Sequence, residues 1–189
     1  MFQILNDKAM YGIVNKAVEG LVTENFGTEA WLKIKAKSEV NINNFISNES
    51  YDDSVTFKLA IAASEVLEIP LKDVLFKFGE YWILSTGVKH YGALMQSGGS
   101  NLKEFLVNLP NFHSRVMLMY PNITPPEFKI VENGDTELVL HYYSTRNGLT
   151  DFMHGLISGM GKMYNQTIDI QLVNAKSINF DHDEFLIKW

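Results

Sequence analysis

The stretch ELVLHYYSTR, residues 137–146, predicts both a fold element and a binding site. Its alternation is typical of a β-strand, because successive strand side chains point to opposite faces. One face begins with two leucines and ends with two hydroxyls and a guanidinium, at Tyr142, Ser144 and Arg146. Arginine binds carboxylates bidentately, and hydroxyls add oriented donors. The triplet therefore favours a ligand that is apolar at one end and anionic at the other. The alternative interpretation is an amphipathic hairpin strand with a solvated tip.

The segments around this strand predict an α+β fold. Asn133-Gly134 favours a tight hairpin between residues 128–131 and 137–146, and residues 167–173 and 184–189 indicate two closing strands. Upstream, helical periodicity predicts helices that open near residues 10, 28, 53, 70 and 102, a stop at Gly27, a loop over 41–50, a new helical segment at Pro110 and a later helix through Phe152 and Met160. We expect an N-terminal helical lobe followed by helices and a roughly four-stranded antiparallel sheet.

Composition limits the classes of function. The chain has 189 residues, 46% of them hydrophobic, which is enough for a sizeable core. Its net charge of -6 argues against a nucleic-acid partner, which needs a basic surface. It has no cysteine, which excludes disulfides and covalent c-type haem attachment. No apolar stretch or leader pattern predicts a membrane segment or a signal peptide, so we expect a cytoplasmic protein.

A second informative segment contains His113, within LPNFHSRV at residues 109–116. Tyr120-Pro121 and Pro125-Pro126 follow it, and Tyr142-x-Ser144-x-Arg146 comes later. This order resembles the haem–nitric oxide/oxygen-binding (H-NOX) family, which includes the haem domain of soluble guanylate cyclase. Further matches are Met10-Tyr11-Gly12, FGEYW at residues 78–82, and Arg146-x-Gly148-Leu149 leading to Gly155-Leu156, so that the resemblance runs from about Met10 to Trp189.

The resemblance implies a role for each residue of the predicted haem site. His113 would be the axial ligand of haem b held without a covalent bond, and Pro126 would press on the porphyrin. Tyr142, Ser144 and Arg146 would hold the haem propionates. Taken alone, a histidine on an apolar helix face is more often a hydrogen-bonded core residue. The local alternative for Pro126 is that it ends a helix-to-strand connection. Here the downstream motifs favour ligation.

The resemblance also places the gas-binding side of the haem. Trp82 falls where members of the family have a distal-pocket side chain, and Phe152 falls near a tyrosine of the oxygen-binding members. Phenylalanine has no hydroxyl to donate to bound oxygen, so the pocket favours NO and CO. The indole N–H of Trp82 is a competing donor. Val14 and Leu75 are further candidates, although ordinary helix packing explains both.

For the whole chain, the resemblance implies a sensor rather than an enzyme. NO would release His113 from a five-coordinate ferrous haem lying between a helical distal lobe at about 10–68 and an α+β proximal lobe at about 69–189. Residues 1–9 would be an extension without an assigned role. The output would pass to a separate protein, a histidine kinase or a diguanylate cyclase. The alternatives are a peroxidase-like haem enzyme and a metal-free carrier of an amphipathic carboxylate.

Other histidines receive less weight. The run Asp181-His182-Asp183-Glu184 has the composition of a metal cluster, but a solvated turn before the last strand explains it better. His141 alternates with Tyr142, and we expect it to point away from the ligand.

Overall fold

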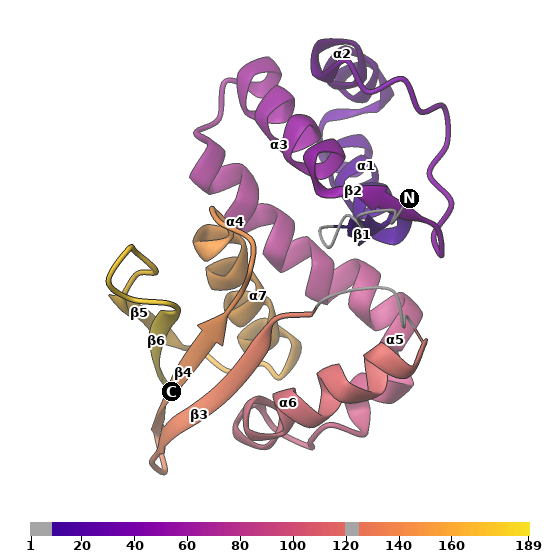
Figure 1. Ribbon diagram of the computed structural model, residues 1–189. Coiled ribbons are helices and arrows are strands. Elements are labelled where there is room, and N and C mark those ends of the chain that lie inside the picture. Colours follow the sequence, from indigo (N-terminus) through magenta and orange to yellow (C-terminus); the bar gives the residue numbers. More distant parts are fainter. Residues whose placement is uncertain (1–8, 120–124) are drawn as a thin grey trace, which may run out of the picture.

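The α+β architecture is confirmed. The computed structural model describes residues 9–119 and 125–189, with α1, α2 and α3 at one end and a four-stranded sheet at the other (Figure 1). Of the predicted extension, residues 1–9, only Ala9 is described. Tyr120 and Pro121 also lie outside the described residues.

The N-terminal helices largely match their predicted positions. α1 spans Gly12–Phe26, α2 spans Thr28–Ser38 and α3 spans Asp53–Leu67. Gly27 ends α1 with φ 84°, a backbone region that glycine adopts without strain, and Asp52 accepts a hydrogen bond from the Ser54 amide at the start of α3. Their facing sides bury one apolar cluster, formed mainly by Ala17, Val18, Val22, Trp31, Ile34, Leu59 and Ala63.

A small sheet corrects the predicted start of the first helix. β1, Ala9–Tyr11, pairs antiparallel with β2, Ser50–Asp52, so α1 begins only at Gly12. Gly12 is needed there, because a Cβ would lie 2.1 Å from the Ile46 carbonyl oxygen. The loop predicted over 41–50 is otherwise confirmed.

A long helical run crosses the molecule and connects its two ends. α4, Leu71–Tyr81, begins after Pro70 as predicted, and it continues into a π-helical segment, η1, Trp82–Gly87, and then α5, Val88–Gln96. The sequence pattern did not predict η1 or α5. A π-helix inserts an extra residue per turn and is frequent at functional sites.

The prediction of a new helical segment at Pro110 is wrong. α6 is one helix, Leu102–Met119, with Pro110 inside it. Proline removes one backbone donor, but buried Leu102, Phe105, Leu106 and Leu109 hold this stretch against the core. Packing therefore outweighs the loss of one helical hydrogen bond.

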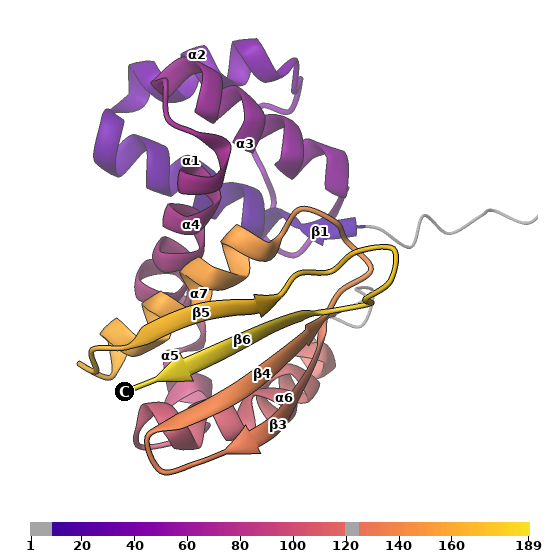
Figure 2. The same ribbon diagram turned by 90° about the vertical axis from the view of Figure 1, so that its left-hand side faces the viewer.

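The sheet has the order β3-β4-β6-β5 and is antiparallel throughout. Its strands are β3, Glu127–Asn133, β4, Glu137–Tyr143, β5, Asp169–Asn174, and β6, Asp183–Lys188. The hairpin and both closing strands are confirmed. Figure 2 shows α5, α6 and α7, Thr150–Met163, behind the sheet, against the face that carries Leu138, Leu140, Phe185 and Ile187. These four side chains are fully buried.

Glycines allow α4 and α7 to cross at very short range. A Cβ on Gly155 would lie 2.0 Å from the carbonyl oxygen of Phe76, and one on Gly79 would lie 2.2 Å from that of Phe152. Such contacts are impossible for any residue with a side chain. The crossing fixes α7, and with it Phe152, relative to the helical run that carries Trp82.

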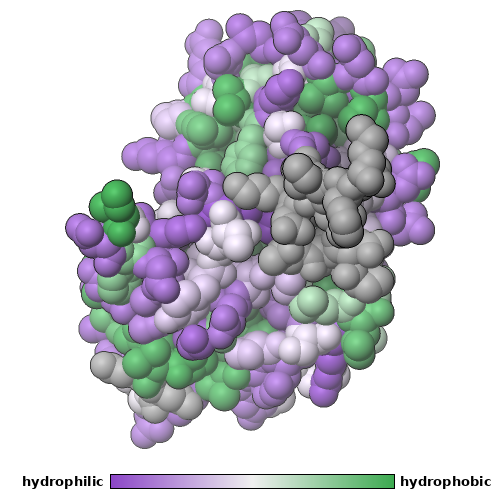
Figure 3. Space-filling view, in the orientation of Figure 1, coloured by the Kyte–Doolittle hydropathy of each residue, from purple (hydrophilic) through white to green (hydrophobic). Residues whose placement is uncertain are grey.

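Two clusters of buried apolar side chains fill the molecule, one among α1–α4 and one between the sheet and α5–α7. Trp82 packs against both. The predicted lobe boundary near residue 68 stays a prediction. In Figure 3, hydrophilic and hydrophobic side chains are interspersed over α1–α3, and further hydrophobic patches lie lower, over the sheet and α6. Within the described residues, none of the helices is long and apolar enough to cross a membrane.

Candidate functional site

An apolar cavity of about 250 Å³ lies where the two clusters meet. α1, η1, α5, α6, β3, β4 and α7 all contribute to its wall. The lining side chains are mainly aliphatic or aromatic, and apart from tyrosines the ionisable residues recorded on the wall are His113 and Arg146. The sequence-predicted residues on the wall are Val14, Trp82, His113, Pro126, Tyr142, Arg146 and Phe152.

His113, on α6, is one of the residues that line this cavity. Its Nδ1 lies 3.3 Å from the carbonyl oxygen of Leu109, one turn earlier in α6, and the Phe128 ring packs 4.6 Å from its ring. Because a carbonyl only accepts, Nδ1 carries the proton and Nε2 keeps its lone pair. Burial lowers the pKa of His113 to about 4. The imidazole is therefore neutral at physiological pH and able to coordinate a metal.

The predicted triplet lies where the cavity meets a second, more polar one. Tyr142 is buried at the end of β4, and burial raises the pKa of its hydroxyl. Ser144 and Arg146 lie beyond the strand, and the Arg146 amide donates to Ser144 Oγ at 3.1 Å. Ser144 lines only the second cavity, of about 430 Å³, whereas Tyr142 and Arg146 line both. The apolar chamber and the polar one therefore lie side by side and share these two residues in their walls, together with Leu149.

Asp53 is a site residue that the sequence did not reveal. Its Oδ2 accepts a hydrogen bond from Arg146 Nε at 2.7 Å, and both side chains are more than 90% buried. The two residues are 93 positions apart, so the contact joins the start of α3 to the loop after β4. The sequence pattern indicated only that a helix opens near residue 53, and no local pattern signals the partner of Asp53.

The gas-side candidates divide into two groups. Val14, Trp82 and Phe152 line the apolar cavity, and the Phe152 ring packs 4.8 Å from that of Phe78. Leu75 is buried in α4 and is not among the lining residues. Its position matches the ordinary helix packing that was the alternative for it.

His141 and His182 lie outside the apolar cavity. His141 lies on the opposite face of the sheet from Tyr142, as expected. The solvated turn predicted for residues 181–184 is wrong, because His182 and Asp183 are buried and Asp183 and Glu184 already belong to β6.

The fold and the cavity define the class of protein, and sequence comparison agrees. The family model described as "Haem-NO-binding" matches residues 11–172. The chain therefore belongs to this family, the H-NOX domains, which are haem-based gas sensors. The family is one of sensor domains.

Two similar proteins are soluble guanylate cyclases. Soluble guanylate cyclase gcy-32 of Caenorhabditis elegans is 30% identical over 93% of this chain, and gcy-34 of the same organism is 28% identical over 95%. The chain spans only about a quarter of the length of either cyclase, 26% and 28% respectively.

Solved structures support the same fold. The unliganded Fe(II) H-NOX protein of K. algicida superimposes with a TM-score of 0.82 and 25% identity, over 95% of this chain and 96% of that one. The Fe(II)NO form of an H-NOX protein from S. oneidensis gives 0.84 at 21% identity, over 95% and 98%. The second likeness concerns the fold alone.

The residues present fit the haem that the family implies. A macrocycle needs an apolar chamber, one neutral nitrogen donor and a polar exit for two carboxylates. The cavity supplies apolar walls, the free Nε2 of His113 and the Tyr142–Arg146 boundary with the polar chamber.

Proposed function

We propose that this chain is a haem-based sensor of nitric oxide. The observation that supports it best is the arrangement at His113. Its Nδ1 lies 3.3 Å from the Leu109 carbonyl oxygen, which leaves Nε2 as the available donor, and its side chain lines an apolar cavity whose wall also includes Arg146. When bound, haem supplies an iron centre to which NO and CO can coordinate. We propose haem b without a covalent bond, because the chain has no cysteine.

In this proposal each residue has a distinct task. His113 supplies the axial imidazole through Nε2, and the Leu109 carbonyl fixes the orientation of its ring. Tyr142, Ser144 and Arg146 bind the two propionates at the polar exit. Pro126 lines the cavity together with His113, where a rigid ring can press on a bound macrocycle.

The gas-side wall favours NO and CO over oxygen. Phe152 carries no donor, and bound oxygen needs one far more than NO or CO does. We expect the ferrous protein to form CO and NO complexes but no stable oxygen complex in air.

Signalling would begin with release of the His113 imidazole. While His113 Nε2 is bound to the haem iron, α6 would be tied to the haem in the cavity. Release of His113 would free α6 to shift. Because α1, η1 and α7 line the same cavity, such a shift can rotate the distal lobe at about 10–68 against the proximal lobe at about 69–189. We propose a histidine kinase or a diguanylate cyclase as the partner that detects this change.

Replacement of His113 by glycine tests the proposal. The expected result is loss of most bound haem, with recovery when free imidazole fills the space left by the side chain. His90→Gly is the matched control, because His90 is an exposed helical histidine away from the cavity. Unchanged haem content and an unchanged ferrous spectrum in His113→Gly would refute the axial assignment. A colourless wild-type protein that takes up no haem would favour the carrier of an amphipathic carboxylate.

A further inference from the structure

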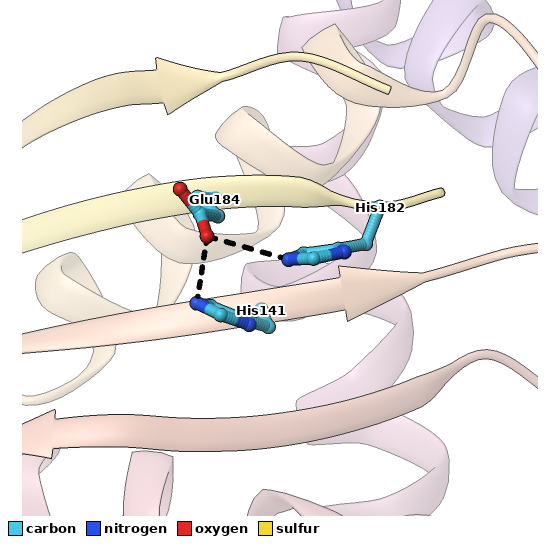
Figure 4. Close-up of side chains that lie close together, drawn as sticks. All are labelled: His141, His182 and Glu184. Atoms are coloured by element: carbon cyan, nitrogen blue, oxygen red, sulfur yellow. Dashed lines mark ion pairs between the residues drawn. The ribbon is translucent and has the colours of Figure 1, made fainter. Parts of the chain in front are cut away.

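A second cluster of potential ligands lies on the outer face of the sheet, away from the haem cavity. It consists of His141 on β4, Glu184 on β6 and His182 just before β6, which point toward one another (Figure 4). His141 and Glu184 are cross-strand partners in the ladder. Among the residues that the structure describes, this is the only set of three or more histidine, cysteine or acidic side chains close enough to share a metal ion.

The geometry of the cluster suits a small divalent cation. Glu184 Oε1 lies 3.0 Å from His141 Nε2 and 3.4 Å from His182 Nε2, and all three ligand atoms fall within 4.8 Å of one another. Ligands about 2.1 Å from a tetrahedral zinc ion are about 3.4 Å apart. Three such ligands leave the fourth position open for water or an anion.

His182 supplies the independent evidence for a ligand. Its side chain is 90% buried, and its Nε2 has no hydrogen-bond partner although it faces Glu184. Its Nδ1 lies 2.6 Å from Asp181 Oδ1, and since a carboxylate only accepts, the ring proton is on Nδ1. Nε2 lies 3.4 Å from Glu184 Oε1 without a hydrogen bond, and a cation bound between the two atoms would give both a partner.

The surrounding groups hold the three ligands in place. Asn174 donates to the other carboxylate oxygen of Glu184, which leaves Oε1 facing the imidazoles. The His182 ring stacks against Tyr143, with centroids 4.3 Å apart, and Phe180 lies at the same distance. A histidine oriented by a carboxylate, as Asp181 orients His182, is the usual arrangement around protein-bound zinc.

We propose that His141, His182 and Glu184 bind a late first-row divalent metal ion, with zinc as the reference. The ion would join β4 to β6 next to the point where β4 delivers Tyr142 to the haem cavity. The proposal is independent of the haem, because none of the three ligands lines that cavity.

Calorimetric titration of the tag-free holoprotein with Zn²⁺ tests the site. We expect one ion per chain, and at least tenfold weaker affinity in each of His141→Gln, His182→Gln and Glu184→Gln. Asp181→Ala should weaken binding about tenfold, because it only orients a ligand. His90→Gln is the matched control and should bind as the wild type does. Haem content should stay constant in all variants, which separates this site from the axial histidine.

X-ray absorption at the zinc edge of the wild-type holoprotein gives an answer even if a variant fails to fold. It should show nitrogen and oxygen neighbours at about 2.0–2.1 Å with imidazole outer shells. The proposal is overturned by the absence of saturable binding, by affinity that survives all three ligand substitutions, or by a spectrum without imidazole. The absence of binding would mean that these side chains contact one another without an ion.

Discussion

Replacement of Asp53 by alanine should separate the two ends of the molecule. Asp53 Oδ2 and Arg146 Nε are 2.7 Å apart, and the side chains are 8% and 9% exposed. Breaking a buried ion pair by removing one partner typically costs about 3–5 kcal/mol. Asp53 Oδ1 is buried without a hydrogen-bond partner, so its removal also relieves one unfavourable atom. We therefore expect Asp53→Ala to lower the free energy of unfolding by about 3 kcal/mol, at the low end of that range.

Removal of the other partner, in Arg146→Ala, should lower the free energy of unfolding further. Arg146→Ala leaves the Asp53 carboxylate buried without its recorded donor, for which we expect about 4–5 kcal/mol. In the double variant neither charge is left behind, so its destabilisation should fall well short of the sum. Such a double-mutant cycle cancels what each side chain contributes on its own, including any role of Arg146 in ligand binding.

Urea unfolding followed by circular dichroism and tryptophan fluorescence measures these differences. The control is Lys37→Ala, which breaks an ion pair with Glu65 whose side chains are both more than half exposed. Exposed pairs contribute at most about 1 kcal/mol. The structural role of the pair would be refuted if Asp53→Ala destabilised the protein no more than Lys37→Ala. Additive effects in the double-mutant cycle would refute it as well.

Three further outcomes are expected. Gly155→Ala should destabilise the fold by about 3 kcal/mol or more in thermal unfolding, because the new Cβ meets the Phe76 carbonyl. Gly92→Ala is the control and should be neutral or stabilising, because no atom lies within 4 Å of its Cβ position. Equal effects of the two substitutions would contradict the close crossing of α4 and α7. Burial raises the pKa of Glu80, but hydrogen bonds from two lysines and a serine leave that pKa below its ordinary value. The stabilisation by Glu80 is therefore fully present above about pH 4.5 and is lost as the pH falls through the lowered pKa. In urea titrations, Glu80→Gln should cost about 1–3 kcal/mol at pH 7 and progressively less on acidification. Phe152→Tyr should lengthen the lifetime of any oxygen complex in the ferrous protein, and an unchanged absorption spectrum in air would count against its place in the gas pocket.

Local pattern was a good guide wherever an element depends on its own residues. The period-two alternation of residues 137–146 and the Asn133-Gly134 turn predicted the hairpin, and Gly27 marked the end of α1. Local rules failed where packing opposed them. Pro110 argues for a new helical start, but the buried face of α6 keeps the helix intact.

The sequence by itself determined the family, the fold class and the short motifs around His113 and Arg146, because their residue types and order are local properties of the chain. Only the tertiary structure decided which groups meet across long separations. It paired Arg146 with Asp53, gave His113 the Leu109 carbonyl as its acceptor, and brought His141 to His182 and Glu184. Sequence spacing cannot specify such contacts, because they depend on how the helices cross and on the register of β4 against β6.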